Sequence, residues 1–162
     1  MYTAAYWIEH LQLQQHVEGG WYCEVYKAAQ TINLTGNKQE KSAATHIYFL
    51  LQQQEFSALH RIASDELWHF YAGTALTVYE ITVEGELIEH VLGNDPANNE
   101  QHFCVIKAGS WFGAKTTGEG DYALVGCTVA PGFDFADFEL AERAALLNLY
   151  PQYVQVIEML TR

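Results

Sequence analysis

The segment SALHRIASDELWHFYAG, residues 57–73, decides the fold, because it combines titratable side chains with the alternation of a β-strand. Alternate residues of a strand share a face, so Glu66, Trp68 and Phe70 should point the same way. His60 has the same parity in the preceding run. If this face lines the interior of a β-structure, a histidine and a glutamate meet beside aromatic rings. The sequence therefore predicts His60 and Glu66 as the candidate catalytic pair.

Further side chains are candidates for contact with a ligand. His69 falls on the opposite face of the same strand unless a β-bulge redirects it. Glu24 shares a strand face with Tyr22 and Tyr26. If His60 and Glu66 are two ligands of a metal ion, either His69 or Glu24 is a candidate for the third. An aromatic pocket for a flat or sugar-like ligand is predicted from four rings, of which about half are expected to be ordinary core: Trp68, Phe70, Trp111 and Phe112.

The chain around this segment has the pattern of an antiparallel β-protein. About nine short β-rich runs follow one another without intervening helices, at 21–27, 42–51, 56–62, 66–72, 76–82, 87–92, 102–106, 111–115 and 124–129. Turn residues at Gly36-Asn37, Glu84-Gly85 and 93–96 join several of them as hairpins. The pattern favours a sandwich or barrel over a parallel sheet, with a jelly roll as the leading prediction.

Helices are expected at both ends of the chain. Thr3 can cap a short helix, in which Ala4, Trp7 and Leu11 lie on one stripe. Apolar residues recur at helical spacing over about 140–161, where Pro151 begins a second helix. We therefore expect one all-β-dominated domain over residues 1–162, with a barrel core at about 21–130 and helices at its two ends.

Composition excludes several classes of partner. Eight Lys and Arg against twenty Asp and Glu give a net charge of −12, which disfavours nucleic acid and anionic membranes. Three cysteines without CxxC spacing suit free thiols in a reducing compartment. Cys127, between two valines of one strand face, is expected to be a small buried hydrophobe. No targeting or membrane-spanning pattern is present, so the expected location is cytoplasmic.

The spacing of His60, Glu66 and Gly73 resembles the first motif of the cupin superfamily. The longer string Ser57-x-x-His60-Arg61-x-x-Ser64-Asp65-Glu66-x-Trp68-His69-Phe70-Tyr71-x-Gly73 is similar to one branch, the cupin-5 family of unknown function. Three more segments share the resemblance: HVEGGWYCEVY at 16–26, AGSWFGA at 108–114 and LVGCTVAPGFDFADFEL at 124–140. The resemblance implies a jelly-roll β-barrel, or double-stranded β-helix, that is usually a homodimer. It implies no established reaction.

Departures from the general cupin pattern bear on metal binding. Ile62 stands at the second histidine position and Phe112 at the histidine of the second motif, so two of the four usual ligands are absent. A catalytic metal normally needs about three protein ligands. We therefore predict no cofactor, with a metal completed by His69 or Glu24 as the alternative. Cys23 stands where the branch has arginine, which weakens any anion-binding role for that strand.

Three functions remain open from the sequence. The first is a small-molecule-binding cupin that catalyses metal-free acid–base chemistry, as a sugar epimerase or isomerase does by analogy, with His60 transferring the proton and Glu66 orienting or charging it. The second is a non-catalytic binding module, in which His60 is a core histidine bonded to Glu66. The third is a metal-dependent, oxygenase-like cupin. His16 and Glu18, beside Gly19-Gly20, form either a loop that closes over the barrel mouth or a simple turn.

Overall fold

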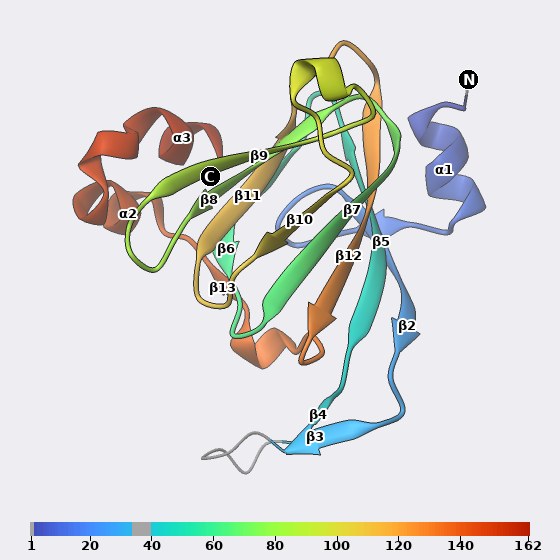
Figure 1. Ribbon diagram of the computed structural model, residues 1–162, viewed down its shortest axis with the longest axis horizontal. Coiled ribbons are helices and arrows are strands. Elements are labelled where there is room, and N and C mark those ends of the chain that lie inside the picture. The colour runs from blue at the N-terminus through green and yellow to red at the C-terminus, as the bar shows by residue number, and fades with distance from the viewer. Residues whose placement is uncertain (1, 34–39) are drawn as a thin grey trace.

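A computed structural model describes residues 2–33 and 40–162, to which all structural statements refer (Figure 1). It is built mainly of antiparallel strands, with helices at the two ends of the chain. The α-helices are α1 (Ala4–His10), α2 (Arg143–Leu149) and α3 (Val154–Met159), and the short 3-10 helices are η1 (Pro96–Asn98), η2 (Phe135–Asp137) and η3 (Pro151–Tyr153). Figure 1 shows α1 at one side of the sheets and α2 with α3 at the other.

The larger sheet contains six antiparallel strands. Their spatial order is β1 (Gln14–Gln15), β2 (Trp21–Lys27), β5 (Thr45–Gln52), β12 (Tyr122–Ala130), β7 (Asp65–Gly73) and β10 (Phe103–Ile106). In the register of β12 with β7, Val129 is opposite Glu66 and Cys127 is opposite Trp68. On the other side Ile106 of β10 is opposite Glu66, so Glu66 is on an interior strand of the sheet rather than at an edge.

The second sheet contains five antiparallel strands. Their order is β13 (Glu139–Leu140), β6 (Phe56–Arg61), β11 (Trp111–Thr116), β8 (Leu76–Ile81) and β9 (Leu87–Leu92). His60 of β6 is opposite Phe112 of β11 on one side and Leu140 of β13 on the other. A separate hairpin of β3 (Thr31–Asn33) and β4 (Glu40–Ser42) projects from the body (Figure 1). His60 and Glu66 thus belong to different sheets.

The main core lies between the two sheets. It is formed by apolar side chains from both, including Phe49, Trp68 and Val125 of the larger sheet and Val78 and Phe112 of the smaller one. The prediction of a mainly β fold is confirmed: within the described residues the strands pair into two open antiparallel sheets around a shared core, and no strand pairing that closes a barrel is seen. Hydrophobic burial between the layers, rather than a continuous hydrogen-bonded ring, holds them together.

Most elements predicted from the sequence are confirmed. All nine predicted strands are present, with ends that shift by up to three residues, and 21–27 and 87–92 are reproduced without change. The Thr3 side chain accepts a hydrogen bond from the backbone N–H of Tyr6 and caps α1 as expected. The turn predicted at Gly36-Asn37 lies outside the described residues. The short strands β1, β3, β4 and β13 were not predicted.

The C-terminal helices complete a second apolar cluster. Leu146 of α2 and Ile157 of α3 are buried against Leu59 of β6 and Trp111 of β11. These helices therefore stabilise the outer side of the strand that carries His60. None of the helices in the described ranges has the length and apolar character needed to cross a membrane.

Candidate functional site

A cavity of about 260 Å³ lies between the two sheets. Its lining combines titratable, polar and aromatic side chains from both layers and from the 131–135 loop. The lining residues are Gln14, His16, Glu18, Tyr22, Glu24, Thr45, Ile47, Phe49, His60, Glu66, Cys127, Val129, Phe133 and Phe135. Such a cavity, with few polar groups converging inside an apolar wall, is the usual form of a small-molecule site.

The loop before β2 brings a third titratable residue, Glu18, into this cavity. Gly19 and Gly20 follow it with φ angles of 112° and 72°, which lie in the region that favours glycine. A Cβ atom on Gly19 would lie 2.2 Å from the carbonyl oxygen of Phe56, so the loop can approach β6 only without a side chain there. The backbone N–H of Ala58 donates to the Glu18 carbonyl at 2.8 Å, which fixes the loop to β6. Glu18 is only 6% exposed as a result.

The Glu18 carboxyl is held between two histidines. Its Oε2 lies 3.3 Å from Nε2 of His60 and 3.4 Å from Nδ1 of His16. Its Oε1 accepts a hydrogen bond of 2.8 Å from the buried hydroxyl of Ser57. The three titratable side chains are therefore one connected group, which we call the His16–Glu18–His60 group.

Hydrogen bonds assign the protons of this group. His60 Nδ1 lies 2.8 Å from the carbonyl oxygen of Ala58, so it carries a proton and donates it. His16 Nδ1 accepts from the backbone N–H of Glu18 at 3.3 Å. In neutral imidazoles the two nitrogens that face the Glu18 carboxyl are thus both acceptors. A protonated Glu18 satisfies this arrangement by donating to one of them.

Burial drives the group toward its uncharged forms. It lowers the pKa of His60 to about 4, against a smaller opposing effect of the Ala58 carbonyl. Burial likewise lowers the pKa of His16 and raises the pKa of Glu18, which the charge of His16 and the Ser57 hydroxyl partly offset. Burial therefore favours the uncharged form of each of the three side chains.

Glu66 faces the same cavity from the opposite sheet. It is 7% exposed, and burial together with the charge of Glu18 raises its pKa from 4.5 to about 8. The neighbouring Cys127 thiol and Trp68 indole partly offset this rise. Burial also raises the pKa of Cys127 well above its ordinary value, so this thiol stays protonated. At neutral pH Glu66 is therefore a carboxylic acid that can donate a proton.

The structure corrects the expected partner of His60. Sequence parity paired His60 with Glu66, whereas the carboxyl within ion-pair distance of His60 Nε2, at 3.3 Å, is that of Glu18. The reason is topological, since β6 and β7 belong to different sheets and their side chains meet only across the cavity. The signal in the sequence was the run HVEGGW, in which the glycine pair allows a titratable loop to fold inward.

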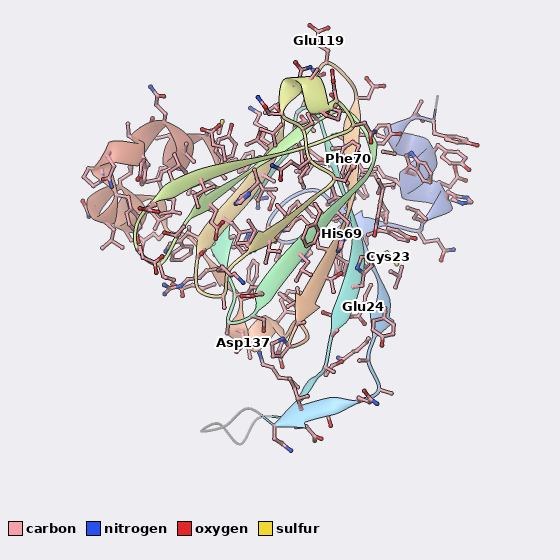
Figure 2. The ribbon with its side chains drawn as sticks, viewed as in Figure 1. Cys23, Glu24, His69, Phe70, Glu119 and Asp137 are labelled. Carbon is pink, nitrogen blue, oxygen red and sulfur yellow. The ribbon has the colours of Figure 1, made fainter. Side chains whose placement is uncertain are left out.

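The predicted ligand-contacting residues are only partly brought together. Glu24 lines the cavity with His60 and Glu66, and it is exposed on β2 (Figure 2). Trp68 and Phe70 have the predicted inward parity, but they and Phe112 belong to the core beside the cavity rather than to its lining. The ring of Phe112 packs 4.1 Å from that of His60 and supports it.

Trp111 and His69 lie elsewhere. Trp111 packs in the cluster under the C-terminal helices, with the Arg61 guanidinium 4.5 Å from its ring centroid. His69 is half-buried and points away from the inward face of β7, 6.2 Å from the ring of His46 and 5.1 Å from that of Phe103. Neither lines the cavity.

Four other rings form the aromatic part of the lining: Tyr22, Phe49, Phe133 and Phe135. Phe133 and Phe135 meet edge to face, with ring centroids 4.9 Å apart, and form a corner of the cavity. Neither was predicted, because both follow the last long strand in a segment whose path the strand pattern does not determine. Phe135 is 55% exposed and so lies at the open side.

The donor set does not fit the metal centre of the wider superfamily. Over residues 2–33 and 40–162, no group of three His, Cys, Asp or Glu side chains has an arrangement that could hold a metal ion. Ile62 and Phe112, at two of the four usual ligand positions, are buried apolar core residues. We therefore derive no chemical step through a metal.

His16 also borders a second hollow. This hollow has a volume of about 300 Å³ and lies on the other side of the Gly19-Gly20 loop, beside Glu55, Phe56 and Arg162. Arg162 donates to the carbonyl oxygen of Val17 at 3.3 Å. Its charge lowers the pKa of Glu18 slightly, from outside the main cavity.

The two facing sheets and the cavity between them define a cupin-like protein. The chain belongs to the Cupin_5 family, described as cupin superfamily (DUF985), whose model matches residues 5–141. A crystal structure of a protein from Shewanella oneidensis is 41% identical, with a TM-score of 0.92 over 100% of this chain and 99% of that one. A hypothetical protein from Leishmania major is 34% identical, with a TM-score of 0.93 over 99% of both chains.

More distant structures share the fold alone. A tryptophan variant of oxalate decarboxylase from Bacillus subtilis is 12% identical, with a TM-score of 0.56 over 90% of this chain and 36% of that one. No curated protein matches the chain. These likenesses establish the fold, and the function depends on the site itself.

Proposed function

We propose that this protein binds a small organic molecule in the cavity and catalyses proton transfer on it without a metal. The observation that carries the proposal is the pairing of two environments across one cavity. Glu66 on β7 has a pKa of about 8 and is a proton donor, whereas His60 on β6 has a pKa of about 4 and is an unprotonated acceptor. Groups whose pKa values are driven apart in one site are the usual acid and base of an enzyme.

The chemistry balances without an additional reactant. Because the Nδ1 proton of His60 is donated to the Ala58 carbonyl, the lone pair of the ring is on Nε2, which accepts a proton from carbon next to a carbonyl group. Glu66 donates its proton to the carbonyl oxygen, which gives an enol. The imidazolium formed at His60 is stabilised by Glu18, 3.3 Å away. Return of the protons to the other carbon or face completes an isomerisation or epimerisation.

Deuterium exchange tests this proposal even when the product is unidentified. The protein is incubated in D₂O with dihydroxyacetone, D-fructose and D-xylose, and exchange at carbon next to the carbonyl is followed by NMR. We expect exchange with at least one compound, and its loss in His60→Ala and Glu66→Gln. Glu119→Gln is the control, because Glu119 is exposed and far from Glu24 in Figure 2. Exchange that survives both site variants contradicts the proposal.

A non-catalytic binding module is the second candidate. The low pKa of His60 favours this candidate, because a weak base removes a proton from carbon slowly. The two functions differ in one result: His60→Ala abolishes exchange but leaves binding in an enzyme, whereas it only weakens binding in a module without turnover.

The homodimer and the cytoplasmic location expected from the sequence stay predictions. Sedimentation velocity of the purified chain tests the first, with a single species at twice the chain mass as the expected result. Fractionation of cells that produce the protein tests the second.

A further inference from the structure

From the side chains that line the cavity, we infer that its ligand is an uncharged carbonyl compound bearing hydroxyl groups, and that phosphorylated or carboxylate-bearing analogues are rejected. This inference rests on the proposed function only in taking the occupant to be a small molecule with a carbonyl group. It concerns the charge of that molecule, which binding can measure without turnover.

The charges around the cavity argue against an anion. Three carboxyl side chains line it, those of Glu18, Glu24 and Glu66, and none of the described lining residues is a lysine or an arginine. A buried anion is strongly unfavourable unless a cation or several N–H donors neutralise it. Here an anionic group would instead meet the exposed carboxylate of Glu24 at the cavity edge.

The nearby cations are engaged outside this cavity. Arg162 lies in the second hollow and bonds to the carbonyl oxygen of Val17. Lys41 is buried in an ion pair with Asp137, beside a separate depression that includes Ser64. Neither side chain lines the main cavity, so neither can compensate a phosphate or carboxylate there.

The lining instead suits a molecule with hydroxyl groups and a C–H face. Gln14, Glu24 and Thr45 supply hydrogen-bonding groups on the larger-sheet side of the cavity. The corner formed by Phe133 and Phe135 adds apolar ring surface, and it adjoins Thr45, whose Oγ1 accepts a hydrogen bond of 3.0 Å from the backbone N–H of Phe133. The combination of amide, carboxylate and hydroxyl groups with aromatic rings can satisfy an uncharged polyhydroxy compound, which carries both kinds of surface.

The test compares paired probes in which one member is uncharged and the other carries a phosphate or a carboxylate. Dihydroxyacetone is compared with its phosphate, D-fructose with its 6-phosphate, and D-glucose with D-gluconate, each by ligand-observed NMR titration of the full chain. In each pair for which binding is detected, we expect the uncharged member to bind with a dissociation constant at least about tenfold lower than that of the charged member. Glu24→Lys should reduce or reverse this difference in affinity. Glu119→Lys changes the net charge equally and should leave the difference unchanged, because Glu119 does not line the cavity and lies far from Glu24 (Figure 2).

Each result has a definite meaning. Equal or tighter binding of the phosphate or carboxylate members overturns the inference, and so does the absence of binding by every uncharged probe. Binding of uncharged probes without deuterium exchange leaves the ligand class intact and contradicts only the proposed proton transfer. Exchange of an anionic probe in D₂O has the opposite meaning, because it supports the chemistry and overturns the ligand class.

Discussion

The Nε2 atom of His60 lies 3.3 Å from Oε2 of Glu18, although one residue comes from a strand of the smaller sheet and the other from the loop before β2. Because His60 already donates from Nδ1 to Ala58, the contact requires a proton on Glu18 or a charged imidazole. Burial raises the pKa of Glu18, and the negative charge that Glu18 carries once it is deprotonated raises the pKa of Glu66 on the facing sheet. The titrations of Glu18 and Glu66 are therefore coupled.

We expect Glu18→Gln to lower the pKa of Glu66. The charge of Glu18 is one of the causes that raise the Glu66 pKa to about 8, so its removal leaves burial as the main cause. Carbon-detected NMR titration of the side-chain carboxyl signals measures the change. Glu119→Gln is the control and should leave the Glu66 pKa where it is. A Glu66 pKa that does not move in Glu18→Gln would show that the two carboxyls are not coupled.

Glu66 should make the stability of the wild-type protein fall as the pH rises from about 4.5 to about 8, most clearly above about pH 6.5, because up to that pH the lowered pKa of His60 acts in the opposite direction. Over this window the folded chain retains the Glu66 proton that the unfolded chain has released, so a higher pH favours unfolding. Each unit of pKa difference corresponds to about 1.4 kcal/mol, which gives a loss on the order of a few kcal/mol from this residue. Urea denaturation at several pH values should show a weaker decline in Glu66→Gln. An identical decline in both proteins would contradict the conclusion that folded Glu66 retains its proton over this pH range.

Gly19→Ala should destabilise the protein more than Gly85→Ala. Both glycines have a positive φ, but the new Cβ at residue 19 meets the Phe56 carbonyl oxygen at 2.2 Å, whereas at residue 85 the nearest atom is a Tyr150 ring carbon at 3.3 Å. We expect a loss of about 1 kcal/mol for Gly85→Ala and roughly 3 kcal/mol for Gly19→Ala. Equal free energies of unfolding would mean that the loop does not need its close approach to β6.

Protein purified without a histidine tag or chelator should contain less than one transition metal ion per ten chains. Ile62 and Phe112 offer no metal-binding atoms, and the described chain has no group of three suitable ligands. Elemental analysis before and after incubation with iron, manganese, nickel and zinc measures the number of metal ions per chain. One tightly held ion per chain would contradict this expectation and revive the metal-dependent alternative.

Much of the fold could be predicted from the sequence because strand periodicity and turn residues are local signals. The parity of Glu66, Trp68 and Phe70 in β7 is confirmed, since alternation follows directly from strand geometry. Whether the strands of a jelly roll close into a barrel could not be predicted in this way, because the pairing of edge strands depends on interactions between distant segments. The single-domain interpretation stays a prediction.

The site was harder to predict because it is assembled across two sheets and a loop. Parity correctly indicates that His60 and Glu66 are buried, but it carries no information on which strands face each other. The position of Glu18 depends on the backbone of two glycines, and the positions of Phe133 and Phe135 depend on an irregular segment. Neither conformation has a periodic pattern in the sequence.

His16 borders both the cavity and the second hollow on the far side of its loop. A molecule that fills the cavity therefore meets His16 from one side only, and the second hollow stays outside the ligand site.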